Sequence, residues 1–204
     1  KDVALEAHRR VPENSTRLAV FVHGTGSSRH SPRNNHVAEV LESDGVASLL
    51  FDLLTEDEDR SRETRFDIDL LTTRVQGVLD WIADDETLSG LALHLFGSST
   101  GAAAAIRTAA AIRTAAAEDR EIRSVVSRGG RPDMAGDALD RLHTPCMLIV
   151  GGNDPRVLSL NRDARDRIPG EVDLRVVEGA THLFEEPGAL DEVASLASEW
   201  IRTH

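Results

Sequence analysis

The sequence is poor in cysteine, lysine and long apolar runs, and each shortage excludes a class of protein. A single cysteine, Cys146, excludes an internal disulfide and is typical of a reducing compartment. No apolar run approaches the ~20 residues that a membrane-spanning helix needs. With one lysine, Lys1, and a net charge of −12, the chain lacks the basic face that nucleic-acid binding requires. We therefore expect a cytoplasmic protein without membrane or nucleic-acid partners.

The composition predicts one globular domain that covers residues 1–204. Hydrophobic residues make up 40% of the chain, enough for a sizeable core. Short apolar runs alternate with segments of helical spacing, which indicates an α/β fold with a mostly parallel sheet and helices on both faces. We expect strands at residues 3–7, 18–22, 47–53, 91–96, 124–127, 146–150 and 174–177. We expect helices at residues 35–43, 67–83, 102–117, 158–168 and 190–202. Polar clusters follow the strands, so they should gather at the carboxyl edge of the sheet, where such folds bind ligands.

The stretch Gly97-Ser98-Ser99-Thr100-Gly101 lies between a predicted strand and a predicted helix. Its pattern, G-x-S-x-G, places a serine on a sharp strand-to-helix turn and raises the hydroxyl of Ser99 above the sheet edge. The two glycines allow the backbone to turn without a Cβ clash. Because the pattern also occurs by chance in Gly- and Ser-rich loops, an ordinary turn is the alternative unless the chain also supplies a base and an acid.

An acid and a base follow at the ends of successive predicted strands. Asp154 lies in Gly-Gly-Asn-Asp-Pro after one strand, and His182 follows the next. A serine nucleophile needs a histidine to take its proton and a carboxylate to hold that histidine in the correct tautomer. We therefore predict Ser99, Asp154 and His182 as the catalytic residues. Asp133, one strand earlier, is the competing acid, and we interpret it as a helix cap or a salt-bridge partner.

The oxyanion of a tetrahedral intermediate needs positioned N–H donors. We predict that they come from Thr100, directly after the nucleophile, and from Thr25, in the loop His23-Gly24-Thr25-Gly26. We assign His23 a structural role in shaping this loop. The rival chemistry is a metal site built from Asp154 and histidines at this edge. The chain has no H-E-x-x-H and no zinc-spaced pair, so we predict neither a metal nor a cofactor.

Together these motifs resemble the α/β-hydrolase superfamily. The loop after the first buried strand, the Ser99 turn and the sequences around Asp154 and His182 carry the resemblance, which covers nearly the whole chain. The small size and the run at 26–34 are similar to dienelactone-hydrolase-like proteins. The resemblance implies an α/β-hydrolase fold and ester hydrolysis through an acyl-enzyme. Dienelactone hydrolase proper uses a cysteine nucleophile, whereas this turn carries a serine, which favours general serine-esterase chemistry. We expect Cys146, inside a strand, to lie in the core.

The segment at 128–145 is too short for the cap domain that many superfamily members insert there. We therefore expect an open site for small or short-chain carboxylic esters. Arginines recur at this edge, and guanidinium groups pair with carboxylates or phosphates. We predict that Arg29 or Arg128 contacts an anionic group of the substrate, although internal carboxylates are the usual partners in so acidic a chain. Two alternatives stay open: a thioesterase or peptidase that uses the same triad, and a binding protein that keeps the fold without activity.

Overall fold

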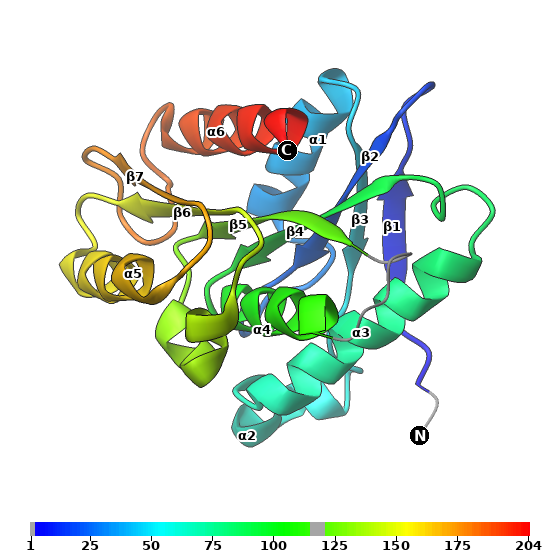
Figure 1. Cartoon of the computed structure of the whole chain (residues 1–204), viewed down its shortest axis with the longest axis horizontal. Coiled ribbons are helices and arrows are strands. Elements are labelled where there is room, and N and C mark those ends of the chain that lie inside the picture. The colour runs from blue at the N-terminus through cyan, green and yellow to red at the C-terminus, as the bar shows by residue number, and fades with distance from the viewer. Residues whose placement is uncertain (1–2, 115–120) are drawn as a thin grey trace.

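The structure is a computed structural model that describes residues 3–114 and 121–204. Its centre is a seven-stranded sheet with the order β1-β3-β2-β4-β5-β6-β7 (Figure 1). The strands are β1 (Ala7–Arg10), β2 (Arg17–Val22), β3 (Ala47–Phe51), β4 (Ala92–Ser98), β5 (Ile122–Arg128), β6 (Cys146–Gly151) and β7 (Val172–Val177). The α-helices are α1 (Pro32–Ser43), α2 (Arg62–Arg65), α3 (Ile68–Asp84), α4 (Thr100–Thr114), α5 (Pro155–Arg167) and α6 (Ala189–Thr203). The 3-10 segments are η1 (Glu58–Arg60) and η3 (Pro132–Arg141).

The sheet is parallel apart from β1, which pairs antiparallel with β3. The central strands β2 and β4 are almost entirely buried, because helices cover both faces of the sheet and most of the strand residues are apolar. From β2 the chain passes to β3 on one side, and β4 then follows on the other, so the strand order reverses between β2 and β4. Ligands of open α/β sheets bind at such a reversal, beyond the carboxyl ends of the strands. The predicted mostly parallel sheet is confirmed.

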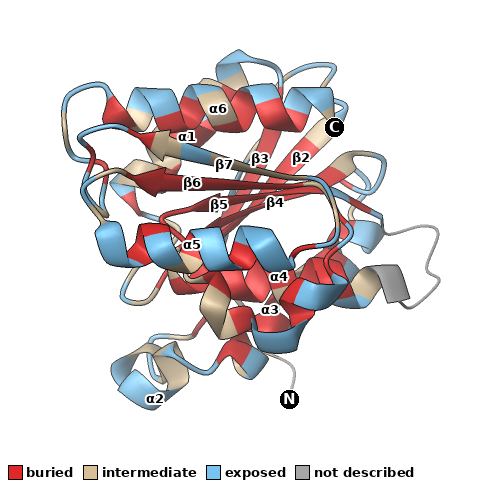
Figure 2. Ribbon diagram, turned by 60° about the vertical axis from the view of Figure 1, so that its left-hand side comes forward, coloured by how far each residue is buried: buried red, intermediate tan, exposed pale blue. Residues whose placement is uncertain are grey.

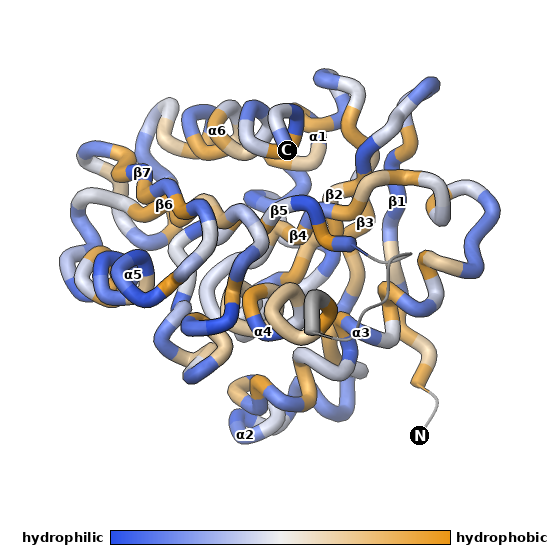
Figure 3. Tube along the Cα trace, viewed as in Figure 1, coloured by the Kyte–Doolittle hydropathy of each residue, from blue (hydrophilic) through white to orange (hydrophobic). Residues whose placement is uncertain are grey.

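Helices cover both faces of this sheet, also as predicted. α1 and α6 lie together on one face, whereas α3, α4 and α5 lie on the other (Figures 1 and 2). Each face has its own apolar core, which Figure 2 shows as buried layers on either side of the strands. Figure 3 shows hydrophobic residues concentrated along the inner strands, and hydrophilic ones along much of α5. The four alanines at 102–105 in α4 are fully inaccessible, because their small side chains let the helix lie close to the sheet.

Capping residues determine where two of the helices begin. Ser31 caps α1 by accepting an N–H of the first turn, and Pro32 occupies the first helical position. Asp154 caps α5 in the same way, followed by Pro155. From the spacing of apolar residues, these helices were predicted to start at residues 35 and 158. The first turn of each helix is polar, so apolar spacing does not detect it. The cap of α5 also places Asp154 at the carboxyl edge of the sheet.

The predicted edge strand was misplaced, and two short helical segments were not predicted. The edge strand lies at Ala7–Arg10 instead of 3–7, and most of its residues are exposed, so no burial pattern marks it. The segment at 55–65, for which no helix was predicted, contains η1 and α2. The helix predicted at 102–117 is observed as α4, and its last three predicted residues lie outside the described residues.

Candidate active site

Ser99 lies on the tight turn between β4 and α4, and its own backbone carries the strain of that turn. Its φ is 50°, a left-handed conformation that residues with a Cβ rarely adopt. Two hydrogen bonds, one to the last residue of β5 and one to the segment after it, hold it there. The Ser99 N–H donates to the Arg128 carbonyl at 3.2 Å, and the Arg131 N–H donates to the Ser99 carbonyl at 3.0 Å. The left-handed residue of the G-x-S-x-G turn is therefore the serine and not a flanking glycine.

Glycines allow the neighbouring backbones to approach this turn closely. A Cβ on Gly101 would lie 2.1 Å from the Val22 carbonyl oxygen, far inside van der Waals contact. The first turn of α4 can therefore press against the end of β2. In the loop that follows β2, a Cβ on Gly24 would lie 2.9 Å from the Cβ of Ser99. These two contacts bring the loop after β2 directly against the predicted nucleophile.

His23 shapes this loop from inside the protein. Its Nε2 accepts the Leu53 N–H at 3.0 Å, so Nδ1 carries the proton and donates to the Gly24 carbonyl at 2.9 Å. Burial lowers the pKa of His23, which keeps the ring neutral and suited to one donor and one acceptor bond. The predicted structural role of His23 is confirmed.

Asp154 and His182 meet at the same edge of the sheet. The Nδ1 atom of His182 lies 2.7 Å from Oδ2 of Asp154. The other carboxylate oxygen, Oδ1, accepts the Val157 N–H at 3.2 Å as the cap of α5. The Asp154 side chain is 16% exposed and the His182 side chain 39% exposed. A carboxylate held in this way keeps the proton on Nδ1 and leaves Nε2 as the acceptor.

The segment at the end of β5 contacts both His182 and the backbone of Ser99. A Cβ on Gly129 would lie 3.5 Å from Cε1 of His182, while the preceding residue, Arg128, is bonded to the backbone of Ser99. The histidine ring and the serine turn therefore border the same short segment. Within the described residues, no hydrogen bond joins the Ser99 hydroxyl to His182. Bonds between a nucleophile and its base are often long before substrate binds.

The two predicted oxyanion donors are adjacent, but one of them already has an acceptor. Thr100 is the first residue of α4, so the helix supplies no acceptor for its N–H, and the helix dipole favours negative charge there. The Thr25 N–H, in contrast, donates to Oγ1 of Thr100 at 2.9 Å. The two hydroxyls lie 2.9 Å apart, and the Thr25 hydroxyl donates onward to the Arg65 carbonyl at 3.2 Å. We call this network the Thr25–Thr100 clip. The Thr25 N–H must leave it to serve an oxyanion.

The rival acid and the cysteine both have structural roles. Asp133 forms a two-pronged ion pair with Arg131, at 2.8 and 2.7 Å, so its predicted salt-bridge role is confirmed. Cys146 is fully buried in β6, and burial raises the pKa of its thiol to about 12. Its predicted place in the core is confirmed, and the reactive thiolate form is suppressed.

The two arginines predicted to contact substrate have very different surroundings. The Arg29 guanidinium pairs with Asp52 and Glu6, and the backbone N–H of Arg29 donates to Oδ1 of Asp52 at 2.7 Å. Arg29 is therefore already neutralised by internal carboxylates. Arg128, at the end of β5, is 8% exposed, and its Nη1 atom is buried without a hydrogen-bond partner. Burial lowers the pKa of Arg128 to about 10, and the nearby cation of Arg33 acts in the same direction.

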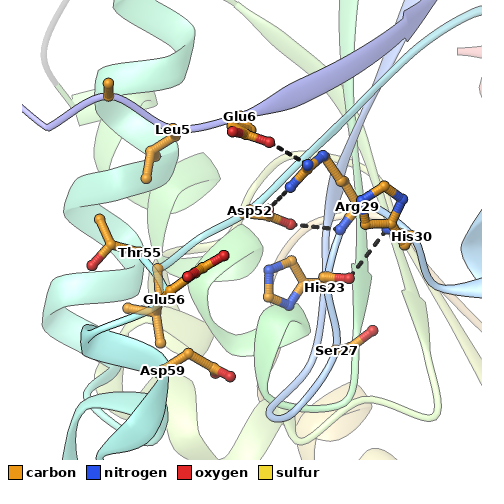
Figure 4. Close-up of a pocket in the computed structure, with 13 residues that line it drawn as sticks. Leu5, Glu6, His23, Ser27, Arg29, His30, Asp52, Thr55, Glu56 and Asp59 are labelled. Atoms are coloured by element: carbon orange, nitrogen blue, oxygen red, sulfur yellow. Dashed lines mark hydrogen bonds and ion pairs between the residues drawn. The ribbon is translucent and has the colours of Figure 1, made fainter.

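A cavity of about 430 Å³ lies next to the site and is lined by His23, Arg29 and the segment that leads into β1 (Figure 4). None of the three predicted catalytic residues lines it. Figure 4 shows the Arg29 side chain between Glu6 and Asp52, so the charges of this cavity are largely paired internally. Across residues 3–114 and 121–204, no group of three or more His, Cys, Asp or Glu side chains is arranged to hold a metal ion.

In the same described ranges, no helix is both long enough and apolar enough to cross a membrane.

Solved structures define the class of fold. No established family profile matches the chain. Est1E from Butyrivibrio proteoclasticus superposes with a TM-score of 0.80 at 17% identity, covering 98% of this chain and 93% of that one. An alpha-beta serine hydrolase homologue from Coxiella burnetii gives a TM-score of 0.77 at 19% identity, covering 97% and 91%. At such identities the likeness concerns the fold alone. The fold is that of the α/β-hydrolases.

Relatives of higher identity narrow the assignment. A dienelactone hydrolase from Anabaena variabilis is 44% identical with a TM-score of 0.93, covering 100% of this chain and 93% of that one. The chain therefore belongs to the dienelactone hydrolase family, and the resemblance carried by its motifs is confirmed. A Mycobacterium tuberculosis protein with the provisional name phosphoribosyl transferase is 52% identical over 203 residues. These residues make up 99% of this chain but 44% of that protein, so the chain spans less than half the length of the curated relatives it matches.

Proposed function

We propose that this chain is a serine hydrolase that cleaves small or short-chain carboxylic esters through an acyl-enzyme. The observation that carries the proposal is the 2.7 Å contact between His182 and Asp154, at the edge where Ser99 is held on a strained turn. A raised serine, a carboxylate-oriented histidine and the N-terminus of a helix are the parts that acyl transfer requires.

In the proposed reaction, Ser99 Oγ attacks the ester carbonyl carbon while its proton passes to Nε2 of His182. The negative charge develops on the carbonyl oxygen, where the Thr100 N–H donates. The bond to the alcohol oxygen then breaks, and His182 protonates that oxygen as the alcohol leaves. Water next gives a proton to His182 and attacks the acyl carbon, and Ser99 regains its proton as the acid departs. Asp154 keeps the Nδ1 proton of His182 in place throughout.

The connection between β5 and β6 supports the expected small substrate. It is folded into η3 (Pro132–Arg141), which packs against α4 and α5. We infer an open site, in which the acyl group is limited by few enclosing walls. The same residues could also cleave a thioester or a peptide bond. Substrates that share one acyl chain but carry an alcohol, a thiol or an amine as the leaving group would separate these activities.

The provisional name of the M. tuberculosis relative indicates a different reaction. We infer that a phosphoribosyl transferase activity would belong to the part of that protein that this chain does not match. Two observations support this inference: the matched part is 44% of that protein, and the present chain, which is 52% identical to it, has the fold of a dienelactone hydrolase. Assaying the relative after removal of its matched part would test it, since loss of transferase activity would contradict the inference.

Covalent labelling tests the proposed function. A fluorophosphonate probe should label the wild-type chain and the Ser159→Ala variant, which alters an exposed serine of α5. The Ser99→Ala variant should take no label and should hydrolyse no p-nitrophenyl acetate above background. If the wild-type chain takes no label while folded, a binding protein that retains the fold is the better description.

A further inference from the structure

The loop that carries His182 is fixed at its start by the residue before Asp154. The backbone N–H of Asn153 donates to the Ala180 carbonyl at 2.9 Å. The Nδ2 atom of the same side chain donates to the Gly179 carbonyl at 2.8 Å. The first residues of the loop are therefore tied to the segment that holds the proposed acid, and only the part that follows them needs another support.

One side chain, Glu186, holds that second part. The N–H of Thr181, directly before His182, donates to Oε1 of Glu186 at 3.0 Å. Hydrogen bonding to Thr181 lowers the pKa of Glu186, so the carboxylate is charged at neutral pH and forms a charge-assisted bond. The carbonyl of Glu186 accepts the Ala189 N–H at the start of α6. Glu186 thus joins the residue before His182 to a helix, and we call residues 181–186 the histidine turn.

The histidine turn is strained, and the proposed base lies within it. Phe184 has a φ of 56°, although it has a Cβ, and its side chain is buried. Its N–H donates to the Thr181 carbonyl at 3.2 Å. A Cβ on Gly129 would lie 3.4 Å from Cε2 of Phe184 and 3.5 Å from Cε1 of His182, so both rings border the same glycine. A left-handed residue of this kind persists only where its surroundings hold it. The bond from Thr181 to Glu186 is one of the contacts that hold it.

We propose that Glu186 is a positioning residue for the hydrolysis proposed above. Its carboxylate holds the histidine turn, so that Nδ1 of His182 stays on Asp154 and Nε2 stays available to Ser99. Glu186 does not act on the substrate itself. Its effect on the rate passes through the position of His182, where a displacement of about 1 Å can cost about a hundredfold. The inference rests on the proposed function and identifies what keeps its base in place.

Kinetics of side-chain variants test this role. Glu186→Met fills a similar space without an acceptor, and it should lower kcat for p-nitrophenyl acetate by about 30-fold. KM should stay within about threefold, because His182 serves acylation and deacylation alike. Glu186→Gln keeps an oxygen that accepts the Thr181 N–H, and it should retain at least about a third of the wild-type kcat. Glu185→Met makes the matched change in the adjacent exposed carboxylate and should leave kcat within about threefold. Glu186→Ala replaces Glu186→Met if that variant does not fold.

Nuclear magnetic resonance tests the same role without catalysis. In the Ser99→Ala background, the imidazole of His182 should show one tautomer, with its proton on Nδ1 and bonded to Asp154. Its signals are assigned by their loss in His182→Gln. Adding Glu186→Met should weaken the Nδ1 proton signal and mix the two tautomers, whereas adding Glu186→Gln or Glu185→Met should preserve the spectrum. A side chain that only stabilises the fold would lower the urea midpoint and leave this signal unchanged.

The two measurements separate the positioning role from the proposed function. If the wild-type chain hydrolyses no ester but Glu186→Met alters the His182 signal, the esterase function is refuted and the positioning role stands. If Glu186→Met leaves both kcat and the His182 signal as they are in its parent, the positioning role is refuted, whatever the change in stability. An equal loss of kcat in Glu185→Met would refute it as well.

Discussion

Replacing Asp154 with asparagine separates its two roles, one in each carboxylate oxygen. Oδ1 caps α5, a task that asparagine performs as well as aspartate, so the free energy of unfolding should change little. Oδ2 contacts His182, where an amide NH₂ would donate to Nδ1 and force the proton onto Nε2. Nε2 could then no longer accept the proton of Ser99. The variant also lacks the attraction between the Asp154 carboxylate and the imidazolium that His182 would become in the transition state.

The distance between Asp154 and His182 determines how far kcat/KM should fall in the Asp154→Asn variant. Two unit charges about 4 Å apart at an effective dielectric constant of about 20 attract by about 4 kcal/mol. At about 1.4 kcal/mol per factor of ten, this corresponds to about a thousandfold in rate. Because His182 is 39% exposed, solvent screens part of the attraction, and we expect a loss of about a hundred- to a thousandfold in kcat/KM.

Steady-state hydrolysis of p-nitrophenyl acetate, together with urea unfolding, measures both outcomes. Asp133→Asn is the matched control, because it makes the same chemical change in the rival acid and should leave kcat/KM within about threefold. An Asp154→Asn variant that keeps more than a tenth of the wild-type kcat/KM would refute the assignment of Asp154 as the orienting acid.

Three further predictions concern the clip, the turn and a buried histidine. Thr100→Val should lower Tm by removing the clip, but it should not lower kcat, since it frees the Thr25 N–H for the oxyanion; a tenfold fall in kcat would contradict this exchange. Gly101→Ala should destabilise the fold by about 2 kcal/mol or more in urea unfolding, because the new Cβ would overlap a carbonyl oxygen of β2. An unchanged urea midpoint would show that the backbone around Gly101 can move to accept the Cβ without loss of stability. His94 is fully buried, and burial lowers its pKa to about 3, below the 6.5 of an exposed histidine. The unfolded chain therefore binds this proton first, so stability should fall as pH drops from 6.5 towards 3. The loss should be smaller in His94→Gln, and an equal pH dependence in both proteins would exclude this cause.

The arrangement of the candidate site could be predicted because it follows from topology. The carboxyl ends of parallel strands meet at one edge, so polar residues after successive strands come together whatever their distance in the sequence. Ser99, Asp154 and His182 follow β4, β6 and β7, and the sequence pattern was enough to bring them to one region. The assignment of their catalytic roles remains a prediction.

Features that depend on side-chain partners could not be predicted in this way. Arg29 and Arg128 look equivalent in sequence, and only the folded chain shows that the first has two carboxylate partners and the second leaves a buried nitrogen unpaired. The Thr25–Thr100 clip was missed for the same reason, since hydroxyl contacts across 75 positions leave no sequence pattern. The boundary of β1 was missed because an exposed edge strand shows no apolar alternation.

The positive φ of Ser99 separates the position of the nucleophile from its chemical identity. The turn is held by backbone hydrogen bonds to Arg128 at the end of β5 and to Arg131 after it, and neither bond uses the Ser99 hydroxyl. Any small side chain at this position would be presented at the same point, at the same conformational cost. If Ser99 is the nucleophile that we propose, one substitution would exchange its oxygen for sulfur, with the proposed base and the helix terminus already in place. The hydroxyl proposed for this chain and the thiol expected from its resemblance to dienelactone hydrolase therefore require no difference in fold.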